Sequence, residues 1–358
     1  MIALLLSASD LKNLMVSCKA GHVAGAPVLY RSVEAWLDPI DFGRLQYEME
    51  NQPVSFLLTL VNSTLPHATL CLPSRFYAAH LVTFCYGSWS LACDYRAMPL
   101  LAEALRFTYR LQHLRLDISG ESVPTLLDVF RRSSIIVTPS TLLPGSRPVD
   151  RHTLPCLRSV RTTRIAVADA LMQHRVLHTV IVDMSIKWEV LAKFLRAAPP
   201  WDPTHLQRLS LYVDDHPPTD GMVEGMLNAF PRLEHLAIRV TAARTPRLLK
   251  DALRVLTELP VLGQSLRALS INHGSYFANY GVVLEDQRSI FAEGISMRPA
   301  LREVVMGSSM WSRQTVFHAW SFSEFEDSFM GHWAWLEHRS EGQWAMSRDA
   351  VRAYHQFG

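Results

Sequence analysis

The sequence predicts an α/β fold in which short parallel strands alternate with helices along one long array. The first observation is a six-residue pattern with apolar residues at its first, fourth and sixth positions, which recurs along the chain. The second is that stretches with helical apolar spacing follow most copies of this pattern. The third is the length, because 358 residues are enough to bury a large core.

The repeat pattern is clearest in the second half of the chain. Close copies begin at Leu111, Leu206, Leu233 and Leu266, and weaker copies begin at Leu157, Leu177 and Leu301. Each copy reads as a strand whose aligned apolar residues face one side, and the helical stretch after it returns the chain to the next strand. This arrangement is typical of a leucine-rich-repeat solenoid with a parallel inner sheet and outer helices.

Four zones follow from this pattern. In the first, Ser9 can cap one helix and Pro27 can open a second helix that ends near Leu37. In the last zone, five of the nine tryptophans favour a cap over the end of the solenoid, with an aromatic ligand site as the alternative. The zones are residues 1–37, a partial helical segment; 38–110, an irregular N-terminal cap or worn first repeats; 111–306, the repeat solenoid; and 307–358, the tryptophan-rich C-terminal cap.

Charge and cysteine content exclude several classes of protein. The net charge of +2 gives no reason to expect a nucleic-acid or membrane partner. Five cysteines are an odd number without paired close spacing, which indicates reduced thiols in a cytoplasmic or nuclear protein. No uninterrupted apolar run approaches the ~18 residues of a membrane span.

The sequence contains no pattern that predicts catalysis. It lacks a glycine-rich phosphate loop, a nucleophile elbow and a cysteine pair with zinc-finger spacing. Asp214, Asp215 and His216 could suggest acid–base chemistry, but Pro217 follows them and a solvated turn explains them better. We therefore expect a binding protein that is not an enzyme and that has no catalytic, cofactor-binding or metal-binding residues.

Two stretches near the start resemble a known family. Residues 9–19 and residues 26–33 are similar to the latter part of an F-box, in the form that precedes irregular leucine-rich repeats in fungal proteins. The Cys18-Lys19 pair and the Pro27-to-Arg31 stretch carry the likeness. The family's motif opens with a Leu-Pro pair and an acidic residue on an earlier helix, and this chain begins after that point. The resemblance is thus to an N-terminally incomplete F-box.

The resemblance implies a function. In that family the F-box docks on a Skp-type adaptor of a cullin-RING (SCF-type) ubiquitin ligase, and the repeats hold the protein to be ubiquitinated. The alternative is a repeat scaffold with a vestigial F-box and no ligase role. Carried over to this chain, the residues that serve the F-box core or its adaptor face are Leu11, Leu14, Val16, Cys18, Pro27, Leu29 and Tyr30.

Strand alternation suggests where a target protein binds. The aligned leucines face inward, so the residues between and beside them face the concave side of the solenoid and are expected to be exposed. Arginine and tyrosine bring large area and directed donors to protein interfaces. The expected partner-binding residues are Arg115, Asp117, Arg161, Tyr212 and Arg239.

Overall fold

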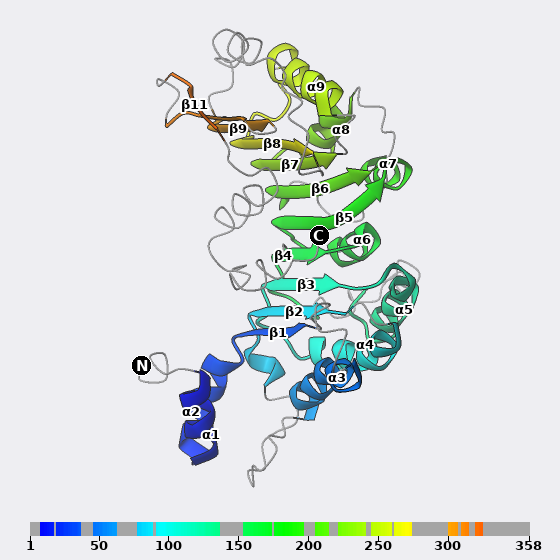
Figure 1. Ribbon diagram of the computed structural model, residues 1–358, viewed down its shortest axis with the longest axis vertical. Helices are drawn as coiled ribbons and strands as arrows, with labels where there is room; N and C mark the ends of the chain where they lie inside the picture. The colour runs from blue at the N-terminus through cyan, green and yellow to red at the C-terminus, as the bar shows by residue number, and fades with distance from the viewer. Residues whose placement is uncertain are drawn as a thin grey trace, which may run out of the picture. The chain divides into compact units, whose positions relative to one another are not determined.

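Short strands and the helices between them make up the computed structural model of this chain (Figure 1). It separates into two compact units, Met1–Arg175 and Val176–Gly358, which we call unit 1 and unit 2. Among the described residues, no helix is long and apolar enough to cross a membrane. The structure describes residues 8–17, 19–36, 46–62, 77–88, 91–136, 153–173, 175–196, 205–214, 221–240, 245–259, 261–273, 300–306, 309–314 and 319–324.

Unit 1 begins with two short helices, α1 (Ala8–Ser17) and α2 (Lys19–Leu29), which we call the helical pair. Gly21 and Gly25 stand four residues apart on α2 and therefore share one face of it. A Cβ atom on Gly21 would lie 2.4 Å from the carbonyl oxygen of Leu14, and one on Gly25 would lie 2.7 Å from a side-chain carbon of α1. The two glycines thus allow the helices to pack closer than larger side chains would permit.

Four parallel strands form the sheet of unit 1. They are β1 (Ser32–Trp36), β2 (Thr83–Gly87), β3 (His113–Asp117) and β4 (Ser159–Thr162). Each strand pairs with the next one along the chain in a single register. Parallel neighbours require a crossover connection, so the intervening segments must return the chain to the starting edge of the sheet each time.

Helices occupy the crossovers of unit 1. They are α3 (Gln46–Asn62), α4 (Leu91–Leu105), α5 (Val123–Arg132) and α6 (Ile165–Met172), with 3-10 turns η3 (Ala78–His80) and η4 (Gly120–Ser122). Proline stands in the first turn of α5, where its missing N–H removes no helical hydrogen bond. Helices α4, α5 and α6 lie on one side of the strands (Figure 1).

The core of unit 1 lies between the strands and these helices. Side chains alternate along each strand, so every second residue points into this core and the others face the opposite side of the sheet. We call that opposite side the far face. The core rows are at most 1% exposed and consist of Phe84, Leu114 and Val160, and of Tyr86, Leu116 and Thr162.

Unit 2 has the same arrangement with five parallel strands. They are β5 (Thr179–Lys187), β6 (Arg208–Asp214), β7 (His235–Val240), β8 (Ala268–His273) and β9 (Glu303–Met306). The repeat residues Leu209, Leu236 and Leu269 form one row, and each is at most 1% exposed. The alignment that the repeat pattern predicts is therefore confirmed for these strands.

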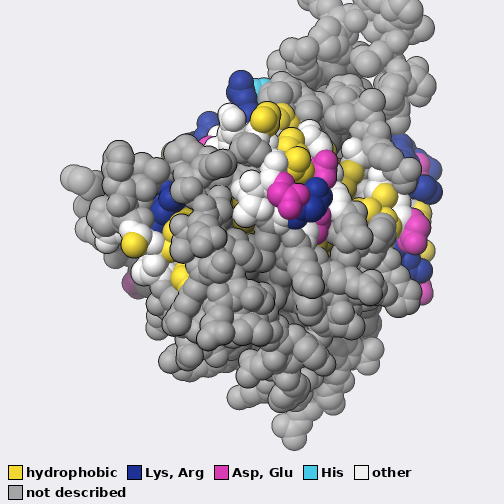
Figure 2. All heavy atoms as spheres, turned by 90° about the horizontal axis from the view of Figure 1, so that it is seen from above, with side chains coloured by type: hydrophobic (Ala, Val, Ile, Leu, Met, Phe, Trp, Pro, Cys, Tyr) yellow, Lys and Arg dark blue, Asp and Glu magenta, His cyan; other side chains and the backbone are white. Residues whose placement is uncertain are grey.

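Three helices cover one side of the unit 2 strands (Figure 1): α7 (Trp188–Arg196), α8 (Met222–Ala229) and α9 (Thr245–Glu258). The rings of Phe194 and Phe230 pack at 6.2 Å between centroids and join α7 to the end of α8. Seen from above, acidic and basic side chains lie beside one another and beside hydrophobic ones, without segregation by type (Figure 2). Such mixing is ordinary for solvated surfaces.

A residue of the next helix caps the amino terminus of α8. Gly221 precedes α8 with a φ of 84°, a left-handed conformation that favours glycine. The Asp251 carboxylate of α9 accepts hydrogen bonds from the backbone N–H groups of Gly221 at 3.0 Å and Val223 at 3.1 Å. Arg254 donates to both Asp251 and Glu224, so charge-assisted hydrogen bonds also join the two helices.

The last described part of unit 2 adds two antiparallel strands to its sheet. β10 (Ser309–Ser312) pairs with both β9 and β11 (Ser321–Glu324). Trp311 of β10 is buried, and the guanidinium of Arg313 lies 4.8 Å from the ring centroid of Trp320. The other three tryptophans of the expected C-terminal cap lie outside the described residues, and they are Trp333, Trp335 and Trp344.

The structure differs from the sequence expectation at the start of the chain. The helix expected to run from Pro27 to about Leu37 ends at Leu29, and β1 follows it. Valine and tryptophan suit a strand, and the in-register pairing of β1 with β2 outweighs helical spacing there. Strand β2 and helix α4 also form a strand–helix unit within residues 38–110, ahead of the first clear repeat copy.

Candidate functional site

The helical pair holds the residues that the F-box resemblance assigns to the core or adaptor face. Leu11 and Tyr30 are only 4% and 6% exposed, so they belong to the core and cannot form an outer contact surface. Leu14, Pro27 and Leu29 are half-buried and reach the surface. Two of the assigned positions lie outside the part of the chain that the structure describes, namely the side chain of Val16 and the whole of Cys18.

An exposed apolar strip runs along α2. Ala20, Val23 and Ala24 are exposed, and Val23 has half of its surface in solvent. Pro27 continues this side of the helix one turn further on. Because α2 has no charged residue after Lys19, this strip offers a partner an apolar, uncharged helix surface. We call Ala20, Val23, Ala24 and Pro27 the α2 strip.

A buried contact that the sequence analysis missed ties the helical pair to the rest of unit 1. The ring of His22 lies 3.2 Å from the Met15 carbonyl oxygen through Nδ1 and 2.9 Å from the Tyr77 hydroxyl through Nε2. A carbonyl only accepts hydrogen bonds, so Nδ1 is the donor to Met15, and Nε2 forms the second hydrogen bond with the Tyr77 hydroxyl. Tyr30 stacks on Tyr77 with 4.2 Å between ring centroids.

The two tyrosines of this contact remain protonated. Burial raises the pKa of Tyr30 to about 12. Burial, with the nearby Tyr30 as a lesser cause, raises the pKa of Tyr77 still further above its ordinary value. Tyr77 therefore keeps its proton in its contact with His22. Because 55 residues separate Tyr77 from His22, no local pattern in the sequence could reveal the pair.

The far face of unit 1 carries two of the expected partner-binding arginines side by side. The register places Arg115 of β3 between Cys85 of β2 and Arg161 of β4. The guanidinium of Arg115 donates through Nε to the Asp117 carboxylate at 2.7 Å and also reaches it through a second nitrogen at 2.7 Å. Asp117 is 1% exposed, so this ion pair is largely removed from water.

The expectation that the partner-binding residues are exposed is wrong for most of them. Arg161 and Arg239 are 3% and 7% exposed, and the side chain of Arg115 is 11% exposed. Tyr212 is half-buried. Alternation along a strand predicts which side of a sheet a residue faces, and the register confirms that side, but alternation does not show whether that side meets water. Contact of these five residues with a partner remains a prediction.

The physical reason for the burial of these arginines is that the far face is itself partly apolar. In unit 2, the far-face residues Ala237, Ala268 and Val305 form a buried cluster, with Met310 of β10 packed against it. Arg239 lies over the ring of Tyr212, with 5.5 Å from its guanidinium carbon to the ring centroid. Parallel sheets commonly bury both faces, and the far face follows that rule.

No group of three or more His, Cys, Asp or Glu side chains among the described residues could hold a metal ion. Asp215 and His216 of the candidate acid–base turn lie outside the described residues. Asp94 is a buried carboxylate of unit 1, and it accepts hydrogen bonds from Tyr86 at 3.0 Å and from Ser122 at 2.6 Å.

Asp94 has a structural role. It is fully buried in α4, and its two oxygens bind the end of β2 and the turn η4. Burial raises the pKa of Asp94 above its ordinary value, while hydrogen bonds from Ser122, Tyr86 and Ser88 oppose the rise. No solvent reaches this carboxylate, so it offers no surface for a substrate. Its hydrogen bonds join neighbouring strand–helix units.

Comparison with known proteins gives no further guide to the site. No protein-family model and no curated protein sequence matches this chain. The class that the fold defines is an α/β protein of parallel strand–helix units with a helical pair at the start of unit 1.

Proposed function

We propose that this chain is the substrate-receptor subunit of a cullin-RING (SCF-type) ubiquitin ligase. In this proposal the helical pair binds a Skp-type adaptor, and the strand–helix units, as leucine-rich repeats, hold a target protein. The observation that supports it best is the position of the apolar α2 strip, which lies on the helix that directly precedes the first parallel strand. The buried contact of His22 and Tyr77 fixes these helices to the rest of unit 1.

A receptor of this kind needs no catalytic group of its own. It holds a target near a charged conjugating enzyme, which raises the effective concentration of the target's lysines. The proposal therefore asks of this chain only two binding surfaces and a stable connection between them. Buried polar groups such as Asp94, which serve packing, are compatible with that requirement.

The second candidate is a repeat scaffold with a vestigial F-box and no ligase role. The observation in its favour is the small apolar surface of the helical pair. Leu11 and Tyr30 are in the core, and among the described side chains Leu14, Leu29 and the α2 strip remain to meet an adaptor. Stable protein interfaces bury roughly 800 Å² on each partner, so an adaptor would need further contacts beyond these residues.

The proposal assigns the protein to the cytoplasm or the nucleus. Cys85, Cys93 and Cys156 are free thiols, and two of them are buried. Free cysteines are typical of reducing compartments, where ubiquitin ligases act.

Co-purification with a Skp-type adaptor tests the proposal. The variant Val23→Asp places a charge in the α2 strip, and Val261→Asp makes the same change at an exposed valine of unit 2. We expect wild type and Val261→Asp to retain the adaptor, and Val23→Asp to weaken binding by about tenfold or more. If wild-type protein does not bind the adaptor, the scaffold alternative replaces the ligase proposal.

A further inference from the structure

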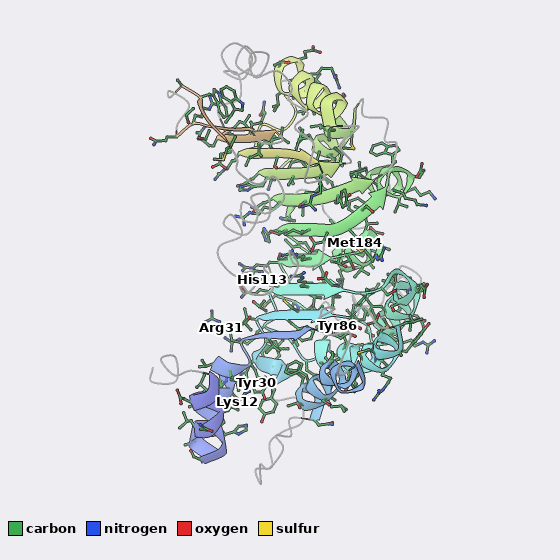
Figure 3. All side chains as sticks on the ribbon, in the orientation of Figure 1. Lys12, Tyr30, Arg31, Tyr86, His113 and Met184 are labelled. Carbon is green, nitrogen blue, oxygen red and sulfur yellow. The ribbon has the colours of Figure 1, made fainter. Side chains whose placement is uncertain are left out.

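A row of residues stands immediately before the strands of unit 1, at their amino ends. The Arg31 carbonyl accepts a hydrogen bond from the Val82 N–H at 2.9 Å, and the Val82 carbonyl accepts one from Gln112 at 2.8 Å. The Gln112 carbonyl then accepts from the Arg158 N–H at 2.9 Å. Adjacent strands lie about 4.8 Å apart. The backbones of Arg31 and Arg158 are therefore about 14 Å apart along the row that crosses the amino ends of the four strands. Figure 3 labels Arg31 and His113, which lie at these amino ends.

Two further cationic side chains and a tyrosine belong to the loop that enters β3. Arg106, Tyr109 and Arg110 follow α4 and are all exposed, and Tyr109 has 56% of its surface in solvent. We call Arg31, Arg106, Tyr109, Arg110 and Arg158 the basic rim. Arginine and tyrosine are the residue types that dominate binding energy at protein interfaces.

Arg110 lies close to the start of β2. Burial lowers the pKa of His80, and the positive charge of Arg110 lowers it further. His80 ends η3, three residues before the first residue of β2. Arg110 precedes Gln112 by two residues, and the Gln112 backbone stands in the row between Val82 and Arg158.

The positive charge of the basic rim is poorly neutralised. Arg31, Arg110 and Arg158 make no ion pair with any residue in the described parts of the chain. Arg106 meets Glu103 at 3.4 Å, but its side chain is 49% exposed and such a pair contributes little. Arg132 of α5, by contrast, has Asp128 as an acidic partner at 2.6 Å.

We propose that the basic rim docks an acidic polypeptide segment of a partner protein. The exposed guanidiniums of Arg31, Arg110 and Arg158 make no ion pair within the described parts of the chain, and they complement several carboxylates along an extended peptide. Tyr109 supplies an apolar contact among them. The span of about 14 Å matches four to five residues of extended chain. A protein partner is favoured over nucleic acid because the whole chain carries a net charge of only +2. This inference does not depend on the ligase proposal.

Fluorescence anisotropy with a labelled ten-residue Glu/Asp peptide and full-length protein tests the proposal. The rim variant combines Arg110→Gln with Arg158→Gln, and the control combines Arg131→Gln with Arg132→Gln at exposed positions of α5. Both variants remove two charges from solvated side chains, and matching thermal unfolding curves verify that both fold. We expect the rim variant to bind the peptide about tenfold more weakly and the control to stay within about twofold of wild type.

Three results would overturn the proposal. The first is wild-type protein that does not bind the acidic peptide at low salt. The second is an equal loss of binding in the two variants, which would indicate unspecific attraction to any arginine. Finally, a labelled single-stranded DNA that binds more tightly than the peptide, and that loses affinity in the rim variant only, would assign the basic rim to nucleic acid.

Discussion

Arg115 and Asp117 stand two residues apart on β3, and their side chains meet at 2.7 Å on the far face. The carboxylate has 1% of its surface exposed, so the guanidinium replaces the water that an isolated carboxylate would require. A buried ion pair contributes little net stability compared with an apolar pair, but removing one partner leaves the other charge without compensation. The effect of the pair on the free energy of unfolding is therefore largest when one partner is removed.

The variant Arg115→Ala should destabilise the fold by about 3 kcal/mol, because it leaves Asp117 buried without its guanidinium. Urea unfolding followed by circular dichroism measures this change. Arg131→Ala removes an exposed arginine and should change the free energy of unfolding by less than about 0.5 kcal/mol. Equal stability of the two variants would show that the far face is solvated at Arg115.

Asp94 makes the stability of unit 1 depend on pH. Its pKa is raised by burial, so the folded state holds the proton more tightly than the unfolded state does. The contribution of this group to stability is fully present below its ordinary pKa of 3.8. That contribution is lost as the pH rises through the raised pKa of the folded state.

In Asp94→Asn the side chain is neutral at every pH. We therefore expect the difference in unfolding free energy, wild type minus variant, to decrease as the pH rises from about 3.5 to about 7. Urea unfolding at several pH values gives this difference, and other titrating groups largely cancel from it. Asp128→Asn, at an exposed ion pair, is the control. A difference that rises with pH would mean that the hydrogen bonds from Tyr86 and Ser122 outweigh desolvation.

At the scale of elements, the helical pair depends on two glycines. Gly21→Ala would place a Cβ atom 2.4 Å from the carbonyl oxygen of Leu14, a backbone atom that cannot move without shifting α1. We expect a loss of about 1–3 kcal/mol from this overpacking. Thermal unfolding of the full chain, with proteolysis of the helical pair as a local readout, measures it.

Gly225 provides a matched control within α8. A Cβ atom there meets nothing within 4 Å, and its backbone is helical. Gly225→Ala should therefore stabilise the protein by up to about 1 kcal/mol, because alanine is the better helix former. If Gly21→Ala behaves like Gly225→Ala, the two helices of the pair are not packed as closely as the structure indicates.

At the scale of the whole molecule, the row of repeat leucines is the feature that the sequence predicts best. Leu209, Leu236 and Leu269 occur at the same position of successive copies, and they form one buried row in unit 2. Periodicity identifies such rows because it reflects local geometry alone. Strand β2 was not predicted, although Leu81, Phe84 and Tyr86 stand at the three apolar positions of the pattern, with aromatic residues in place of the aliphatic ones of the clear copies.

Features that depend on distant contacts could not be predicted in this way. His22 and Tyr77 meet across 55 residues, and Asp251 reaches back 30 residues to Gly221. The burial of Arg161 and Arg239 depends on what lies against the far face, which strand alternation does not encode. Residue type and spacing therefore predicted strands β3 to β9, and they failed at β1 and β2 and where tertiary packing decides.

Leu236→Ala tests the shared interior of unit 2. The side chain is fully buried between neighbouring repeat leucines, and truncating it should cost about 2–5 kcal/mol. Val261→Ala, at a valine with 79% exposure, should cost less than about 0.5 kcal/mol. Denaturant unfolding compares the two, and a Leu236→Ala variant as stable as Val261→Ala would contradict the assigned row.

The carboxylate of Asp251 has a consequence for the order in which the chain matures during synthesis. Helix α8 leaves the ribosome before the carboxylate that caps the N–H groups of Gly221 and Val223, which emerges about 30 residues afterwards, so water must hydrate them until then. At a translation rate of roughly 5–20 residues per second, this delay lasts about 1.5–6 s. A nascent polypeptide halted between these two helices would therefore expose a frayed end, which is a site where a chaperone or protease would act first.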